Sequence, residues 1–220
     1  MLIAPHSTEN TTKNLTYNTT MTKLGINLSK KSNDDEYYTP RAAIEMLKSA
    51  LVKSRFPPNK KKINKIYRTS PKSRKKVVVW ECFGCDFDYI ESPKYIKHMG
   101  YNVIANGEDF WTSNYGSFVI SNPPYHTPRG ERNMKERVIE RLCELNKPFC
   151  LLMPTTYLQT KSFKRMVDKY GKFQIVMPST KIQFYQVNPD THEKKTKGKC
   201  SFYTCWYCWN MGFENDFIMV

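Results

Sequence analysis

Asn122, Pro123, Pro124 and Tyr125 are the residues whose types and spacing are best suited to chemistry. They follow an apolar run, 118–120, that predicts a buried strand. Two prolines cannot continue the hydrogen bonds of a sheet, so the chain must leave the strand abruptly, with the Pro123 carbonyl turned outward. The Asn122 amide oxygen, this carbonyl and the Tyr125 ring would then surround one small space. A planar heterocycle with an exocyclic amine fits there, because the two oxygens accept its amino protons and its ring stacks on the tyrosine.

A purely structural interpretation of these four residues is a proline turn that closes a strand and leaves Tyr125 on the surface. However, Asn-Pro-Pro-aromatic is also the catalytic motif of methyltransferases that act on amino nitrogens. The chain resembles them, in particular the small adenine-N6 DNA methyltransferases of phages and viruses. The resemblance implies that Asn122 and the Pro123 carbonyl bind the amine and localise its lone pair, while Tyr125 stacks on a base flipped out of the duplex. Neither a metal nor a covalent intermediate is required.

Apolar runs alternate with stretches of helical periodicity, which predicts an α/β fold with a mostly parallel sheet and helices on both faces. The predicted strands are 77–81, 102–105, 118–121, 149–153, 173–177 and 201–209, and the predicted helices after residue 80 are 88–99, 131–145 and 161–170. Gly100 and Gly171 are expected to end the first and the third of these helices, and the third is expected to turn Phe163, Met166, Val167 and Tyr170 inward. A loop joins the last two strands, which favours an antiparallel last strand. This arrangement resembles the Rossmann-like class I methyltransferase fold. Such sheets bind ligands at the carboxyl ends of their strands, where both Glu81 and Asn122 are expected.

The resemblance implies that S-adenosylmethionine binds in the loop after the first strand. This loop keeps the acid and one glycine of the family pattern, and Cys85 and Phe87 stand where glycines are common. The nearest acid after the second strand is expected to bind the ribose, and an Asp-Phe pair to hold the cofactor adenine. The residues implied to bind the cofactor are Tyr38, Thr39, Pro40, Glu81, Phe83, Gly84, Asp86, Glu108, Asp109 and Phe110. The alternative for Glu108 and Asp109 is that they are solvated loop carboxylates.

Thr39 and Pro40 form a helix-start signal, with threonine as N-cap and proline at the first helical position. Apolar residues follow at helical spacing, at positions 43, 46, 47, 50 and 51. Taken alone this is an ordinary amphipathic helix. It also resembles the Tyr-Thr-Pro segment that lies against the methionine end of the cofactor in the phage-type enzymes.

The 220 residues carry a net charge of +15, with a pI near 9.5, which favours a polyanionic partner. Charge alone does not separate DNA from RNA, and the resemblance favours DNA. No apolar run reaches 18 residues, so a membrane-spanning helix is excluded and no membrane partner is expected. The first residues lack the apolar core of a secretory signal. We therefore expect a soluble intracellular protein in a bacterial or virus-infected cell. Oligomeric state is not predicted.

The composition divides the chain into a disordered leader, 1–33, and a single methyltransferase domain, 34–220. Within the domain, residues 53–76 include eleven basic residues and no acidic one, which indicates a solvated linker or a flexible phosphate-binding arm. This arm and the lysine-rich stretch 186–199 are the candidates for target recognition. Since lysines position a protein on phosphates more than they read bases, a short target and strong salt dependence are expected.

Seven cysteines include two C-x-x-C pairs, Cys82 with Cys85 and Cys205 with Cys208, so a Cys₄ zinc site must be considered. The second pair lies in a strand pattern, where residues three apart point to opposite faces. Buried, reduced cysteines are therefore the better interpretation.

Two other functions stay open. The same motif suits methylation of adenine in RNA or of another amino group. A non-catalytic nucleic-acid-binding module on the same fold would explain the scarcity of glycines in the cofactor loop.

Overall fold

The computed structural model describes residues 37–58, 77–84, 91–105, 110–127, 129–187, 191, 193–195 and 201–220. Its helices are α1 (Arg41–Val52), α2 (Ser92–His98), α3 (Met134–Glu144) and α4 (Lys161–Tyr170), with the 3₁₀ helix η2 (Thr155–Gln159). Its strands are β1 (Val78–Trp80), β2 (Asn102–Ile104), β3 (Phe118–Ser121), β4 (Phe149–Pro154), β5 (Phe173–Met177), β6 (Gln186–Val187), β7 (Lys194–Lys195), β8 (Thr204–Trp209) and β9 (Phe217–Met219). The predicted leader and most of the basic arm lie outside the described residues.

Seven of these strands form one sheet in the order β2-β1-β3-β4-β8-β5-β9, and β6 and β7 form a separate two-stranded ribbon. The first four strands of the sheet are mutually parallel, and β8 is antiparallel to both β4 and β5. The predicted α/β fold, with its mostly parallel sheet and an antiparallel late strand, is confirmed. β8 lies inside the sheet, however, and the last strand is β9, which pairs in parallel with β5 and was not predicted. Only three residues long and mostly exposed, β9 carries too short a pattern to recognise.

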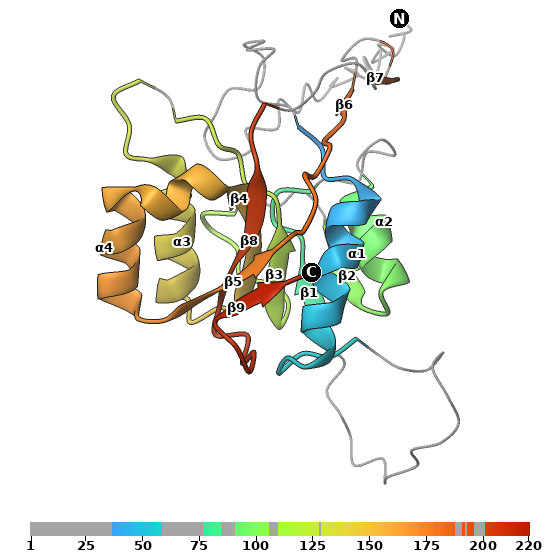
Figure 1. Ribbon diagram of the computed structural model, residues 1–220, viewed down its shortest axis with the longest axis horizontal. Helices are drawn as coiled ribbons and strands as arrows, with labels where there is room; N and C mark the ends of the chain where they lie inside the picture. The colour runs from blue at the N-terminus through green and yellow to red at the C-terminus, as the bar shows by residue number, and fades with distance from the viewer. Residues whose placement is uncertain are drawn as a thin grey trace, which may run out of the picture.

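Helices cover both faces of the sheet, as predicted: α1 and α2 lie on one side, and α3 and α4 on the other (Figure 1). Strand β4 shows how the sequence supplies both layers. Cys150 and Leu152 belong to the core on the α1 side, whereas Phe149, Leu151 and Met153 belong to the core on the α3 side. Because both faces are buried, the strand is an unbroken apolar run rather than an alternating one. Because β3 is buried among these central strands, its carboxyl end, where Asn122 lies, has a fixed position in the sheet.

Side-chain caps fix the first turns of two helices at this edge. The Asn133 side chain accepts hydrogen bonds from the backbone amides of Lys135 and Glu136, at 3.0 and 3.4 Å. The Thr160 hydroxyl accepts one from the Phe163 amide at 3.1 Å. α4 ends at Gly171, whose φ of 77° is the left-handed conformation that glycine adopts at least cost. The predicted helix ends at Gly100 and Gly171 are both observed.

Two details of the predicted helices are wrong. Pro40, not Thr39, is the N-cap of α1, and no side chain caps that helix. The reason is that a backbone bridge between Tyr38 and Tyr185 keeps the chain extended, so the helix begins one residue later. Val167, predicted to face inward on α4, is 36% exposed, because α4 buries the narrower stripe of Ser162, Phe163 and Met166.

None of the described helices is both long enough and apolar enough to cross a membrane.

Candidate active site

Strands β1 and β3 are parallel neighbours, with Trp80 opposite Val119, so their carboxyl ends lie side by side. The predicted proximity of Glu81 and the Asn-Pro-Pro-Tyr turn is therefore confirmed. Glu81 follows β1 and is only 3% exposed, although it carries a carboxylate. A buried carboxylate at a strand end requires hydrogen-bond donors, and these come from the neighbouring strand and from its own loop.

The Ser121 hydroxyl at the end of β3 donates a hydrogen bond to Oε1 of Glu81, and the Phe83 backbone amide donates a second at 3.3 Å. Gly84 closes the loop, with its amide 3.3 Å from the Glu81 carbonyl. A Cβ added at Gly84 would lie 2.4 Å from Cγ of Glu81. This position requires glycine because the loop backbone wraps directly against the buried acid.

Asn122 is held at both ends of its amide group. Its Nδ2 donates to the Tyr37 carbonyl at 3.1 Å, and its Oδ1 accepts from the Tyr125 hydroxyl at 2.6 Å. A carbonyl can only accept, so the contact with Tyr37 fixes which end of the amide is nitrogen. The oxygen consequently faces the proline turn. An amide oxygen has two lone pairs, and the hydroxyl of Tyr125 uses one of them.

Tyr125 is tied into the sheet through its hydroxyl and its backbone. The hydroxyl lies 2.9 Å from the Leu152 carbonyl on β4 as well as 2.6 Å from Asn122. Lys135, in the first turn of α3, donates to the Tyr125 carbonyl at 2.7 Å, and its ammonium lies 5.8 Å from the ring centroid. The half-buried ring meets Phe202 edge-on at 5.6 Å. The motif is therefore braced from β4, α3 and the segment that precedes β8.

The segment before α1 reaches the same place. Tyr37 packs edge-on against Phe202 and Phe184, at centroid distances of 5.4 and 6.2 Å. The ring of Tyr38 stacks on Tyr185 at 5.6 Å. Burial raises the pKa of Tyr185 to about 12, so this phenol stays neutral at physiological pH. The structure thus brings the Tyr-Thr-Pro segment next to Asn122, with Thr39 buried behind it.

Phe110 forms the floor of an aromatic cluster beside the loop 81–84 that follows β1. It is 1% exposed and lies 4.8 Å from Phe83, 5.7 Å from Trp80 and 4.9 Å from Trp111. Phe83 and Trp111 are half-buried and form the outer surface of the cluster. A planar ligand at this surface would meet Phe83 before Phe110.

The structure therefore brings together most of the predicted site residues that it describes: Glu81, Phe83 and Gly84 in one loop, and Asn122 to Tyr125 beside the 37–40 segment. Asp86, Glu108 and Asp109 lie outside the described residues. Sequence reasoning missed four supporting residues, namely Tyr37, Ser121, Lys135 and Phe202. Ser121 could have been found from its place before the motif. The other three act through the backbone or through ring contacts, which leave no sequence pattern.

The cysteines of the described chain are core residues. Cys82, Cys205 and Cys208 are buried, and Cys205 and Cys208 belong to opposite faces of the sheet, as the strand pattern predicted. Cys85 lies outside the described residues. Among the residues that the structure describes, no three histidine, cysteine or acidic side chains are grouped to hold a metal ion.

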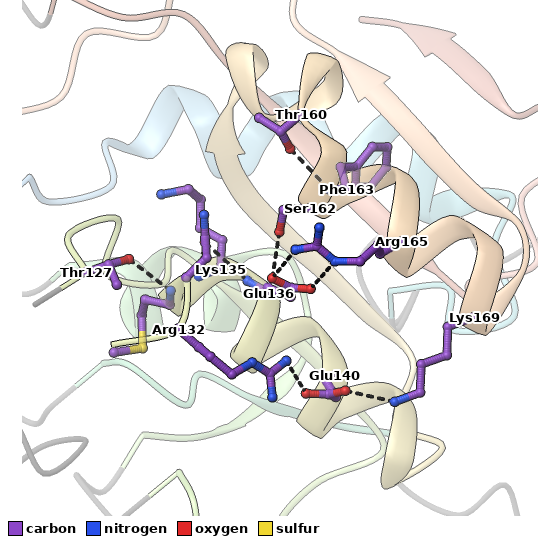
Figure 2. A network of polar contacts seen from close by, with 12 residues as sticks. Thr127, Arg132, Lys135, Glu136, Glu140, Thr160, Ser162, Phe163, Arg165 and Lys169 are labelled. Atoms are coloured by element: carbon purple, nitrogen blue, oxygen red, sulfur yellow. Dashed lines mark hydrogen bonds and ion pairs between the residues drawn. The ribbon is translucent and has the colours of Figure 1, made fainter. Parts of the chain in front are cut away.

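A hollow lies between α3 and α4, and its charges are already paired (Figure 2). Arg165 binds Glu136 through two nitrogens at 3.0 Å, and Ser162 donates to the same carboxylate. Glu140 joins Arg132 and Lys169, each at 2.8 Å. These contacts dock one helix on the other. Because the carboxylates neutralise the bases, this hollow is a poorer ligand site than the sheet edge.

No family model and no curated protein matches the chain. One solved structure is similar: a protein from Listeria monocytogenes, provisionally assigned as a class I S-adenosylmethionine-dependent methyltransferase. It is 12% identical, with a TM-score of 0.44, and the match covers 88% of this chain and 68% of that one.

Proposed function

We propose that this chain is an S-adenosylmethionine-dependent methyltransferase that acts on the N6 amino group of adenine in DNA. The observation that carries the proposal is the orientation of Asn122. Its nitrogen is tied to the Tyr37 carbonyl, so its oxygen faces the proline turn, where it accepts a hydrogen bond from Tyr125 and keeps its second lone pair for an amine. A surface asparagine on a simple turn would need no such anchor.

The residues beside Asn122 suit the methyl donor, which would supply an electrophilic methyl group from its sulfonium. Glu81 provides a carboxylate fixed by Ser121 and by the Phe83 amide, and Phe83 provides a half-buried ring. Gly84 lies so close to Glu81 that no Cβ fits, which keeps the loop narrow beside the acid. These are a carboxylate for hydroxyl groups, an aromatic surface and a narrow glycine loop, as a nucleoside requires.

The proposed role of the motif is to make the adenine amine nucleophilic. Its lone pair is delocalised into the ring, so it attacks poorly while the nitrogen is planar. Hydrogen bonds from the amine to Asn122 Oδ1 and to the Pro123 carbonyl favour a tetrahedral nitrogen, which localises the lone pair. The remaining requirement is alignment with the methyl group, and orientation of this kind supplies a large part of many rate enhancements. Tyr125 would stack on the base once it has left the duplex.

The test is incubation of the full chain with S-adenosylmethionine labelled in its methyl group and with DNA, RNA or protein, followed by nucleoside analysis. Labelled N6-methyladenine from DNA is the expected product. Asn122→Ala should lower the rate by about 100-fold or more, because it removes an acceptor aimed at the reacting nitrogen. Calorimetry should show that this variant still binds S-adenosylmethionine.

Asn102→Ala is the matched control, since Asn102 is an exposed asparagine on β2. It should leave the rate unchanged. Normal methylation by Asn122→Ala would refute the mechanism. A wild-type chain that binds DNA but not S-adenosylmethionine would instead support the non-catalytic module. Methylation of RNA alone would show that the substrate is RNA and not DNA.

A further inference from the structure

Tyr203, which directly precedes β8, displays a large aromatic ring on the surface of the candidate active-site edge. The residue is 62% exposed, although its backbone is fixed: its carbonyl accepts a hydrogen bond from the Thr155 amide at 2.9 Å. The ammonium of Lys181 lies 4.9 Å from its ring centroid. A cation thus lies over one face of an exposed ring whose backbone is fixed.

Tyr203 directly follows Phe202, and Phe202 contacts the proposed catalytic motif. Phe202 turns inward and contacts both Tyr125, at 5.6 Å, and Tyr37, at 5.4 Å. Since β8 is antiparallel to β4, its first residues lie beside Pro154, at the carboxyl end of β4. Tyr203 therefore lies at the same sheet edge as Asn122. It lies on the outer side of the contact between Phe202 and Tyr125.

Three described segments meet around Tyr203, and none of them contains an acidic residue. The charged residues of 154–163, 178–187 and 201–204 are Lys161 and Lys181, and the rest are apolar or uncharged polar residues. These segments therefore present a polyanion with two cations and no carboxylate of their own. Exposed aromatic rings next to cations are the usual means by which proteins bind unpaired nucleotides, since every base has a face that can stack.

We propose that Tyr203 and Lys181 form a platform that binds an unpaired nucleotide next to the adenine to be methylated. Tyr203 stacks on the base, and Lys181 lies near its phosphate. This inference rests on the proposed function and narrows its substrate class: the preferred DNA is single-stranded, or is opened by more than one nucleotide around the target. A flipped single base inside an intact duplex would leave the platform empty.

The test measures binding by fluorescence anisotropy of the full chain to three labelled DNAs of one sequence. These are a 20-nucleotide single strand, the fully paired duplex, and a duplex with three unpaired nucleotides around its only adenine. Tyr203→Ala should weaken binding to the single strand and to the opened duplex by about fivefold or more, the usual effect of one stacked base. Tyr203→Phe keeps the ring and should bind like the wild type.

Phe217→Ala is the matched control, because Phe217 is an aromatic residue of similar exposure, 55%, on the outermost strand β9. It should not change affinity for any of the three DNAs. Unchanged binding by Tyr203→Ala, or an equal loss on the fully paired duplex, would overturn the platform. Labelled N6-methyladenine would then still support the proposed function. Conversely, a chain that binds single strands through Tyr203 but transfers no methyl group would overturn that function and keep the platform.

Discussion

At the scale of single residues, the Asn122 amide is the centre of the candidate site because both its nitrogen and its oxygen are hydrogen-bonded. Tyr37 fixes the nitrogen through a backbone carbonyl, so no substitution at position 37 removes that acceptor directly. Tyr125 fixes the oxygen through a side-chain hydroxyl. The hydroxyl is therefore the part of the arrangement that mutation can test.

Tyr125→Phe should lower the methylation rate by about tenfold while leaving the affinity for S-adenosylmethionine unchanged. The variant keeps the ring for stacking but removes the hydroxyl that lies between Asn122 and the Leu152 carbonyl. Loss of one hydrogen bond costs up to about 1.5 kcal/mol, which corresponds to about a tenfold change. Single-turnover methylation measures the rate, and calorimetry measures cofactor binding. A wild-type rate would show that the hydroxyl does not position the amide.

Gly84→Ala should weaken binding of S-adenosylmethionine by about tenfold or more. The new methyl group would meet Cγ of Glu81 at 2.4 Å and displace the carboxylate from Ser121. Overpacking of this kind costs about 1–3 kcal/mol. Ser121→Ala should weaken cofactor binding in the same direction without steric pressure, because it removes the same contact. If both variants bind the cofactor normally, Glu81 is a structural acid and not part of the cofactor site.

At the scale of elements, the first turn of α3 joins the motif to α4. Lys135 holds the Tyr125 carbonyl, and its neighbour Glu136 binds Arg165 and Ser162 on α4 (Figure 2). Hydrogen bonds from Arg165, the leading cause, lower the pKa of Glu136 below its usual range despite its burial. A carboxyl group with a lowered folded pKa stabilises the fold above its unfolded pKa, and that contribution is lost as pH falls through the folded value.

Glu136→Gln should therefore destabilise the protein by about 1 kcal/mol at neutral pH, or a few degrees in melting temperature. The difference from the wild type should shrink as pH falls from about 5 to about 3, since the wild-type carboxyl then protonates as well. Thermal melts across this range measure the effect. Glu45→Gln, at a carboxylate that pairs with Arg41 on the surface, should have little effect on stability at neutral pH. A pH-independent difference at position 136 would refute the ionic contribution.

The elements themselves could be predicted because burial on both sides of the sheet leaves unbroken apolar strands and clear helical stripes. β4 and α3 are examples. β9 could not be predicted, since its three mostly exposed residues form too short a pattern and, among the described strands, pair only with β5. The N-cap of α1 was misplaced by one residue, because the Tyr38–Tyr185 bridge is a contact between distant segments. In the site, residue types revealed Glu81 and Asn122, but backbone and ring partners such as Tyr37 and Phe202 need the fold.

At the scale of the whole molecule, the net charge of +15 should control the encounter with nucleic acid but not with the cofactor. Phosphate contacts release counterions, so the DNA affinity should fall by about tenfold or more between 50 and 200 mM salt. The affinity for S-adenosylmethionine should change less than about twofold. Anisotropy and calorimetry at matched salt concentrations measure the two affinities. Parallel salt dependence of both affinities would indicate a general loss of folded protein instead.

The bond between Asn122 and the Tyr37 carbonyl joins residues 85 positions apart. Strand β3 pairs with β1 and β4 and not with the 37–40 segment, but the amide acquires its orientation only when that segment docks. Methyl transfer would then appear late during refolding and disappear early during partial unfolding. The proposed activity would then report on completion of the fold, and a nascent or partly opened chain would carry the full motif without an oriented acceptor.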